Sequence, residues 1–293
     1  MQKKKTILIV DDTETNIDIL LELLSDEYDI LVSLDGKNAL EIVDEEKIDL
    51  ILLDIMMPNM DGYEVCSILK ASETTKDIPV IFITAKTDED SIEKAYEVGG
   101  IDYVVKPFKP RELKARVKTQ LELKSLMEHL KFIASHDMMT GIYNRRKFFS
   151  SASKKFDASR QNIYAVMLDI DKFKSVNDNY GHSIGDDVIK LISKTISEHI
   201  EDDSIFGRIG GEEFAIICSC DSIENAIKKM EIIRELVDEQ EVITDDGTVV
   251  KFTISLGISK ATDEMKDLDE LLKIADDALY KAKGTGRNRV IFR

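Results

Sequence analysis

The sequence predicts an α/β protein in two parts: a doubly wound parallel sheet, joined by a long helix to an α+β domain. The first part alternates five short apolar runs with amphipathic segments of helix length up to Phe108, which is typical of a parallel sheet. No Pro or Gly occurs at residues 111–134, so the chain can continue there as one helix. After His136, long helical segments flank strand-like runs and a Gly-Gly pair, which indicates an α+β arrangement.

Length and composition narrow the class of protein. The 293 residues suffice for two domains, each with its own core. The 40 basic and 57 acidic residues give a net charge of -17, which argues against general binding to nucleic acid or to an anionic membrane. No apolar run approaches the roughly eighteen residues of a membrane span. Cys66, Cys218 and Cys220 lack metal-finger spacing, and we therefore expect a reducing, cytoplasmic location.

The first part reads as five strands with helices between them. The predicted strands are residues 7–10, 30–33, 50–53, 79–84 and 103–105, and the predicted helices include residues 16–24 and 62–70. Ligands of such sheets bind beyond the carboxyl ends of the strands. Polar residues mark four of these ends: Asp11-Asp12, Asp54, Thr84 and Lys106. Three carboxylates can hold Mg²⁺, and a hydroxyl and an ammonium suit a phosphorylated aspartate, so we expect one site.

The same residues carry a family resemblance. Asp11-Asp12, Leu53-Asp54-Ile55-Met56-Met57-Pro58, Thr84-Ala85 and Lys106-Pro107-Phe108 resemble the receiver domain of bacterial response regulators over residues 4–122. The resemblance implies that Asp54 accepts phosphate from a histidine kinase and that Lys106 pairs with the phosphate. It also implies a switch pair of Thr84 and Tyr103, a cis Lys106–Pro107 peptide, and Mg²⁺ bound by Asp11, Asp12, Asp54 and the carbonyl of Met56. We predict a receiver domain over residues 1–122.

A helix is predicted to follow this domain. Pro110 suits its first turn, where the N–H that proline lacks has no partner within the helix. Leu123, Met127, Leu130 and Ala134 follow 4-3-4 spacing, which is consistent with a short seam against a partner helix. An amphipathic helix packed on its own domain explains the spacing equally well, and the sequence leaves both open. We predict a helical linker over residues 123–135, which in the first case would link phosphorylation to dimer geometry.

The second part is organised around Gly210-Gly211-Glu212-Glu213-Phe214. Strand-like runs at residues 204–209 and 214–218 flank the glycine pair. They predict a tight primed turn with positive φ at both glycines and the two glutamates at the rim. The apolar run at residues 163–170 predicts a strand covered on both faces that emerges at Asp169. Carboxylates from two neighbouring strand ends suit Mg²⁺, which substrate phosphates usually complete, although an acidic hairpin tip alone is common and needs no ligand.

The remaining segments complete this domain. We predict helices at residues 145–159, 185–200, 221–238 and 268–283, a strand at residues 251–259 and one more strand after the last helix. The domain resembles the GGDEF family of diguanylate cyclases in five blocks: His136 to Arg146, Asp169 to Asp178, Gly181 to Asp186, Gly210 to Phe214 and Ala275 to Asn288. The resemblance implies a palm-like cyclase sheet. We therefore predict a cyclase domain over residues 136–293.

The resemblance also implies the residues that handle metal and phosphate. Asp169, the carbonyl of Ile170 and Glu212 would bind Mg²⁺ on the phosphates of GTP. Glu213 is expected to point to the other face of its strand and to matter less than Glu212. Lys174 would stabilise charge that develops on the phosphates, with help from two residues near the chain end, Lys283 and Arg287.

Asn177 and Asp186 match positions that hydrogen-bond guanine in this family. Both also sit beside predicted helix ends, where capping is the alternative role. The implied reaction joins two GTP molecules into cyclic di-GMP with loss of two pyrophosphates. Each domain supplies one GTP, so the mechanism requires a homodimer.

One stretch departs from the family. Many members carry an inhibitory product site, Arg-x-x-Asp, that ends five residues before the first turn glycine, where this chain reads Glu201-Asp202-Asp203-Ser204. We predict that this site is absent. The lead hypothesis is a phosphorylation-regulated diguanylate cyclase. The competitor is a catalytically silent module that responds to GTP or binds a protein, and a third possibility, a cyclase for another nucleotide, conflicts with Asn177 and Asp186.

Overall fold

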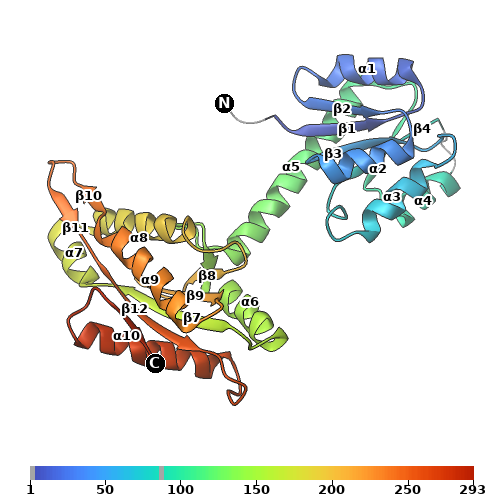
Figure 1. Cartoon of the computed structure of the whole chain (residues 1–293). Coiled ribbons are helices and arrows are strands. Elements are labelled where there is room, and N and C mark those ends of the chain that lie inside the picture. Colours follow the sequence, from blue (N-terminus) through green and yellow to red (C-terminus); the bar gives the residue numbers. More distant parts are fainter. Residues whose placement is uncertain (1–3, 86–88) are drawn as a thin grey trace. The chain divides into compact units, whose positions relative to one another are not determined.

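A computed structural model of the chain describes residues 4–85 and 89–293 (Figure 1). The chain divides into two compact units, Met1–His129 and Leu130–Arg293. Each unit has its own main sheet with helices packed on both faces. The division agrees with the change of pattern that the sequence predicts. No helix in the part of the chain that the structure describes is long and apolar enough to cross a membrane.

The first unit is a five-stranded parallel sheet in the order β2-β1-β3-β4-β5. Its strands are β1 (Thr6–Val10), β2 (Asp29–Ser33), β3 (Leu50–Asp54), β4 (Val80–Thr84) and β5 (Asp102–Val105). One face is covered by α2 (Gly36–Glu45), α3 (Gly62–Ala71) and α4 (Glu89–Glu97), and the other by α1 (Glu14–Leu24) and the first half of α5 (Pro110–Ser135). This order is that of flavodoxin-like sheets, so the predicted doubly wound fold is confirmed.

The end of β3 is shaped by the start of α3. Gly62, the first residue of α3, lies so close to the strand that an added Cβ would stand 2.2 Å from the carbonyl oxygen of Asp54. The N–H of Gly62 donates to the carbonyl of Ile55 at 3.1 Å. Only glycine allows this approach, which brings a helix start against the strand end that carries Asp54. The Lys106–Pro107 peptide is cis, as expected.

Helix α5 runs without interruption from Pro110 to Ser135, as predicted. Its first half buries Leu113, Val117 and Leu121 in the core of the first unit. The residues of the predicted seam are all exposed: Leu123 (48%), Met127 (64%), Leu130 (57%) and Ala134. The seam therefore does not pack on its own domain, and that interpretation of its spacing is wrong.

The second unit contains a six-stranded mixed sheet in the order β13-β12-β7-β9-β8-β6. Its strands are β6 (Tyr143–Asn144), β7 (Ile163–Ile170), β8 (Ile205–Arg208), β9 (Glu213–Ser219), β12 (Ile254–Lys260) and β13 (Val290–Phe292), and a separate hairpin pairs β10 (Glu241–Ile243) with β11 (Val249–Lys251). Helices α8 (His182–Ser197) and α9 (Ile223–Asp238) cover one face, and α6 (Arg145–Ala158) and α10 (Leu268–Gly284) the other. The α+β prediction is confirmed.

Helix α10 packs unusually close to β12. A Cβ added to Gly257 of β12 would lie 2.1 Å from both the carbonyl oxygen of Ala275 and the backbone nitrogen of Leu279. The glycine thus removes the side chain that would keep the helix at an ordinary distance from the sheet. The close contact fixes the last turn of α10, which carries Lys283, beside the end of β7.

The structure corrects three details. A helix that was not predicted, α7 (Phe173–Tyr180), precedes α8, which starts at His182 because Gly181 has φ 86 between the two. The strand predicted at residues 251–259 is divided between β11 and β12.

The predicted primed turn is also wrong. Neither Gly210 nor Gly211 has a positive φ, and four residues, 209–212, connect β8 to β9. The N–H groups of Ile209 and Gly210 both donate to the carbonyl of Glu213, at 2.9 and 3.3 Å, which closes this wider loop. A Cβ on Gly210 would lie 2.6 Å from Oε2 of Glu213, so the first glycine leaves room for that side chain.

Candidate functional site

Three carboxylates converge at the carboxyl edge of the first sheet. Ligand oxygens of Asp11, Asp12 and Asp54 all lie within 4.8 Å of one another. Asp11 and Asp54 are buried at the ends of β1 and β3, while Asp12 is exposed. Asn16 Nδ2 donates to both oxygens of Asp11, at 2.9 and 3.1 Å, and so orients that carboxylate. A compact set of carboxylate oxygens is the donor set that a hard divalent cation prefers, so these residues fit the predicted metal.

Lys106, just after β5, joins this cluster. Its Nζ lies 2.8 Å from Oδ2 of Asp11 and 3.1 Å from Oδ1 of Asp54. Burial raises the pKa of Asp54, the Lys106 ammonium opposes the shift, and the negative charge of Asp11 adds to it. The ammonium therefore helps to keep a buried carboxylate ionised, which is the form that can attack a phosphoryl group.

The other receiver residues lie at the same edge or next to it. Thr84 is the last residue of β4 and is buried. Tyr103 in β5 is half-buried, packs against the core on the α2-α3-α4 face, and meets Tyr96 edge-on with ring centroids 6.4 Å apart. Met56 follows β3 with its side chain exposed, so only its backbone carbonyl suits the role that the resemblance implies.

In the second unit, Asp169 is the last acidic residue of β7 and is buried. Nζ of Lys283, from the last turn of α10, lies 2.8 Å from its Oδ2. Burial raises the pKa of Asp169 to about 6, Lys283 opposes the rise, and the charges of Glu212 and Glu213 add to it. A carboxylate that is costly to ionise, with one cation beside it and two more carboxylates near, is a strong candidate for binding a divalent ion.

The register of the sheet corrects the expected orientation of Glu213. Asp169 of β7 is paired directly with Glu213 of β9, so the two side chains lie on the same face of the sheet. Glu213 also lines a pocket on this face together with Met167 and Ala215. Glu212 precedes the strand, and alternation along a strand does not fix the direction of a loop residue. Both glutamates thus remain candidates beside Asp169, and alternation does not rank them.

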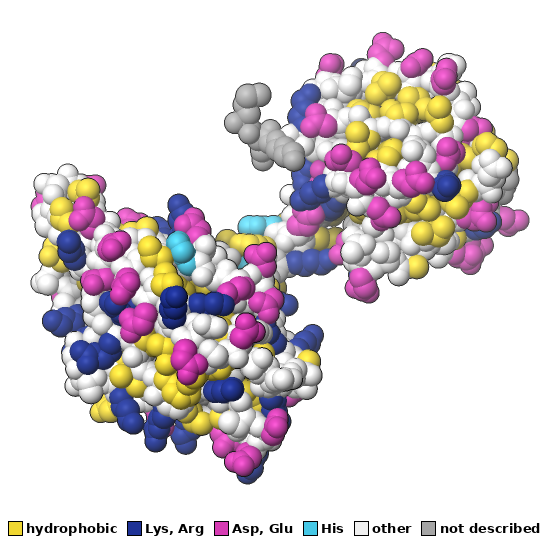
Figure 2. Space-filling model, viewed as in Figure 1, with side chains coloured by type: hydrophobic (Ala, Val, Ile, Leu, Met, Phe, Trp, Pro, Cys, Tyr) yellow, Lys and Arg dark blue, Asp and Glu magenta, His cyan; other side chains and the backbone are white. Residues whose placement is uncertain are grey.

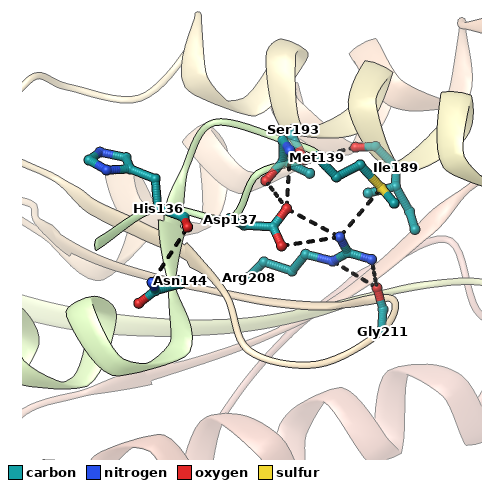
Figure 3. Close-up of polar contacts among 9 residues, drawn as sticks. His136, Asp137, Met139, Asn144, Ile189, Ser193, Arg208 and Gly211 are labelled. Carbon is teal, nitrogen blue, oxygen red and sulfur yellow. Dashed lines mark hydrogen bonds and ion pairs between the residues drawn. The ribbon is translucent and has the colours of Figure 1, made fainter. Parts of the chain in front are cut away.

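Arg208 holds the loop that carries Glu212 and leads to Glu213 at the start of β9 (Figure 3). Its Nε and Nη2 donate to the carbonyl of Gly211 at 3.0 and 2.7 Å, and its Nη1 lies 3.2 Å from Oδ1 of Asp137. Asp137 in turn accepts from the backbone N–H and the hydroxyl of Thr140, at 3.0 and 2.7 Å. These bonds lower the pKa of Asp137 against its burial. Figure 3 shows the guanidinium between the carboxylate and the glycine carbonyl, so the start of the second unit is tied to the glutamate loop.

The sequence analysis missed the pair of Arg208 and Asp137. The available signal was a charged residue at the end of an otherwise apolar strand, two residues before the first glycine of the pair. The partner lies 71 residues away in the chain, and no spacing rule connects them.

The predicted guanine residues lie where α7 meets α8. Asn177 is inside α7 and Asp186 is inside α8, and both are half-buried. A Cβ on Gly185 would lie 2.0 Å from Oδ1 of Asn177, so the two helices touch at this amide. The caps of these helices are Lys172 and Gly181, without any side-chain cap bond, so the capping alternative is wrong.

The remaining cations are less constrained. Lys174 of α7 and Arg287 in the loop after α10 are exposed, and Arg287 has φ 64. Neither side chain has a hydrogen bond or ion pair within residues 4–85 and 89–293. The structure therefore brings Lys283 to Asp169, while the other two basic side chains have no partner among the residues that it describes.

The acidic loop 201–204 connects α8 to β8. Glu201 pairs with Lys229, and Asp203 Oδ2 lies 2.8 Å from Nζ of Lys155. Each lysine lowers the pKa of the carboxylate that it contacts. These carboxylates are thus neutralised by lysines of the chain itself, and the absence of the inhibitory product site stays a prediction.

Two family models match the chain. The model described as diguanylate cyclase, GGDEF domain, matches residues 134–289, and the response regulator receiver domain matches residues 7–118. The response regulator PleD of Caulobacter vibrioides is 31% identical over 97% of this chain and 65% of its own length. The diguanylate cyclase DgcM of Escherichia coli is 36% identical over 58% of this chain and 41% of DgcM. The chain thus spans about two fifths to two thirds of the length of these relatives.

Solved structures agree with these matches. The coiled coil and GGDEF domain of DgcB from Caulobacter crescentus, in complex with c-di-GMP, has a TM-score of 0.56 and 28% identity, and the match covers 62% of this chain and 99% of that one. The diguanylate cyclase SiaD of Pseudomonas aeruginosa, in complex with its activator SiaC, has a TM-score of 0.53 and 27% identity over 69% of this chain and 76% of that one. The first unit matches the receiver model, and the second unit contains the sheet that matches the cyclase model. The chain belongs to the GGDEF family of diguanylate cyclases.

Proposed function

We propose that the chain is a phosphorylation-regulated diguanylate cyclase, which condenses two GTP molecules into cyclic di-GMP and releases two pyrophosphates. The observation that carries the proposal is the buried carboxylate of Asp169, with Lys283 at 2.8 Å, Glu212 on the adjacent loop and Glu213 at the start of β9. The proposed domains are a receiver over residues 1–122, a helical linker over residues 123–135 and a cyclase over residues 136–293. The acidic residues and turn glycines that a catalytically silent domain would lack are all present in this chain.

Asp169, Glu212 and the carbonyl of Ile170 would hold Mg²⁺ in the cyclase. The ion would supply activation of the attacking 3′-hydroxyl and neutralise the departing pyrophosphate. Lys283 opposes the rise in the pKa of Asp169, and its position beside that carboxylate also suits contact with phosphate oxygens. The side chains of Lys174 and Arg287, which are unpaired among the described residues, are suited to bind the same phosphates, and Glu213 lies on the face of Asp169.

Guanine would be recognised where α7 and α8 touch. The carboxylate of Asp186 can accept hydrogen bonds from the base amine and ring N–H, and the amide of Asn177 can donate to the carbonyl. Both side chains are half-buried, and neither has a hydrogen bond within the described residues, so their polar atoms are available. A base without the guanine carbonyl and amine would leave these groups unpaired, which predicts preference for GTP over ATP.

Regulation would begin at Asp54, with a histidine kinase as phosphate donor. Asp11, Asp12, Asp54 and the carbonyl of Met56 would hold the Mg²⁺ that phosphoryl transfer needs. Lys106, already in contact with Asp54, would pair with the phosphoryl group, and Thr84 and Tyr103 would respond to it.

A homodimer would bring the two GTP-bound domains together. The exposed seam on α5, formed by Leu123, Met127, Leu130 and Ala134, supports pairing with the α5 of a second copy. Exposed apolar side chains at 4-3-4 spacing gain burial when two such helices pair.

The test is pyrophosphate release from GTP with Mg²⁺, with and without acetyl phosphate as phosphodonor. We expect the native chain to turn over GTP faster with the phosphodonor. Glu212→Ala should lose turnover. Asp54→Ala should keep its basal turnover and lose only the acceleration by the phosphodonor. Glu264→Ala, which removes an exposed carboxylate that belongs to neither proposed site, serves as control. Binding of GTP without pyrophosphate release in any condition would favour the silent module instead.

A further inference from the structure

Asp171 is the second carboxylate of Asp169-Ile170-Asp171, and the proposed function leaves it without a role. It is 7% exposed. Its Oδ1 accepts from the hydroxyl of Ser255 at 2.6 Å, and its Oδ2 accepts from the hydroxyl of Thr253 at 2.7 Å and the N–H of Asn288 at 2.9 Å. Its own N–H donates to the carbonyl of Thr253 at 2.9 Å. Asp171 therefore ties the end of β7 to β12 and to the loop after α10, with most of its acceptor capacity in use.

The backbone on both sides of this carboxylate is left-handed. Lys172 has φ 55, Arg287 has φ 64 and Asn288 has φ 45, which makes three of the five non-glycine residues with positive φ among those described. Such conformations are unfavourable for residues with a Cβ and persist where the surroundings hold them, often at ligand sites. Asp171 contributes to this hold, because it accepts a hydrogen bond from the N–H of Asn288 and directly precedes Lys172 in the chain.

These residues line a pocket of 410 Å³ between α7, the β11–β12 junction and the loop after α10. Three exposed cations stand around it: Lys172, Lys251 and Arg287. None of their side chains has an ion pair in the described part of the chain. Asp171 is the one acidic residue of the lining, and its oxygens are already hydrogen-bonded.

Charge makes an anion the expected occupant. The chain has a net charge of -17, so three cations without acidic partners around one pocket are a local exception. Figure 2 shows Lys and Arg side chains gathered at the lower left of the second unit, over the region where α7 and the end of α10 lie in Figure 1. Lys251 belongs to none of the proposed catalytic contacts, so it can report on this pocket separately.

We propose that Asp171 is a positioning residue that sets Lys172, Lys251 and Arg287 around this pocket, and that the pocket binds a phosphate-bearing anion. The choice of anion rests on the proposed function, which offers two sources: the terminal phosphates of bound GTP and released pyrophosphate. Binding by the pocket itself does not require turnover, so the two proposals can fail separately.

The first test is calorimetric titration of the full chain with pyrophosphate, without nucleotide. We expect Lys251→Gln to weaken binding roughly five-fold, as loss of one charge-assisted contact would do. Lys228→Gln, which removes the same charge from an exposed site on α9, should bind as the native chain does. Equal affinity in the native chain and Lys251→Gln would overturn the assignment of the pocket.

The second test separates the geometry of Asp171 from its charge. In Asp171→Asn, the amide oxygen can still accept from the N–H of Asn288 and the amide NH2 can donate to a hydroxyl. This variant should therefore keep the positions of the residues around the pocket and bind pyrophosphate at least as tightly as the native chain. Asp171→Ala loses all three bonds and should bind at least five-fold more weakly, with folding checked by its melting temperature. If that variant does not fold, Thr253→Val, which removes one of the bonds, takes its place. If Asp171→Ala binds pyrophosphate with the affinity of the native chain, the positioning role of Asp171 is refuted.

The source of the anion is separated by steady-state kinetics of Lys251→Gln. A raised KM for GTP indicates that the pocket holds the terminal phosphates of the substrate. A raised inhibition constant for pyrophosphate at unchanged KM indicates free pyrophosphate. Either result supports the pocket, and native values of both constants would contradict it.

Discussion

Replacing Asp169 by asparagine tests what the buried carboxylate at the end of β7 contributes to stability. Burial raises its pKa from 3.8 to about 6 despite the ammonium of Lys283. Because the folded-state pKa lies above the ordinary value, the native chain binds more protons between these two pH values, and its stability rises as pH falls through that window. Above pH 6 the carboxylate is ionised, and its burial lowers the free energy of unfolding by the full amount. For this difference in pKa, that amount is roughly 3 kcal/mol.

Asp169→Asn has no charge to bury at any pH. We expect it to raise the free energy of unfolding of the second unit by up to about 3 kcal/mol at pH 8, or its melting temperature by roughly 6–12 °C. At pH 5 the gain should fall to about half, since the native carboxylate is then largely protonated. GTP turnover should be lost, because an amide is a poor ligand for a divalent cation.

Differential scanning calorimetry of the full chain at pH 8 and pH 5 measures both effects, with Glu264→Gln as a control that alters an exposed carboxylate. A melting temperature below that of the native chain at pH 8 would show that the contact with Lys283 outweighs burial, and the reasoning would be refuted. A gain that does not depend on pH would refute it equally, since the cost would then not come from ionisation.

Contacts elsewhere lead to three more expectations. Arg208→Ala removes the hydrogen bonds to Gly211, so GTP turnover should fall at least about tenfold, and steady-state turnover at the native level would contradict the role of this contact. Gly62→Ala forces a Cβ against the carbonyl of Asp54 and should destabilise the first unit by about 1–3 kcal/mol; calorimetry that shows no loss would exclude the close approach. Leu130→Glu places a charge on the exposed seam and should lower the dimer fraction in sedimentation without lowering the melting temperature, whereas native dimerisation would rule out the seam.

The elements that the sequence predicted well have unambiguous local signals. The strand at residues 163–170 agrees with the structure at both ends, because a run of apolar residues stops at polar loops. Helix α7 was missed because it spans only eight residues, of which two are buried, and it is rich in Asn, Asp and Ser. Such residues favour caps and turns over helix interiors, so only tertiary contacts of α7, such as the one at Asn177, define it.

The site could be predicted by residue type but not by register or by long-range pairing. The sequence pointed to Asp169, Glu212 and Glu213, yet which glutamate shares the face of Asp169 depends on the pairing of β7 with β9. That pairing is set by how two strands align across the sheet, and no property of either strand alone contains it. The contact of Arg208 with Asp137 is likewise a product of the fold, because β8 and the start of the unit are distant in sequence.

Asp169 and Asp171 show how the fold divides two equal carboxylates of one motif. Within the described part of the chain, the carboxylate of Asp169 is held by one flexible cation, so its remaining lone pairs are open to a ligand, and its burial makes a positive partner favourable. Asp171 accepts from two hydroxyls and one backbone N–H that are fixed by the sheet and the loop, so little capacity is left for a cation. The number of fixed donors around each oxygen, rather than the identity of the residue, therefore makes one aspartate a candidate metal ligand and the other a structural anchor. Because both sit within three residues at one strand end, a shift of that end would disturb the metal site and the cationic pocket together.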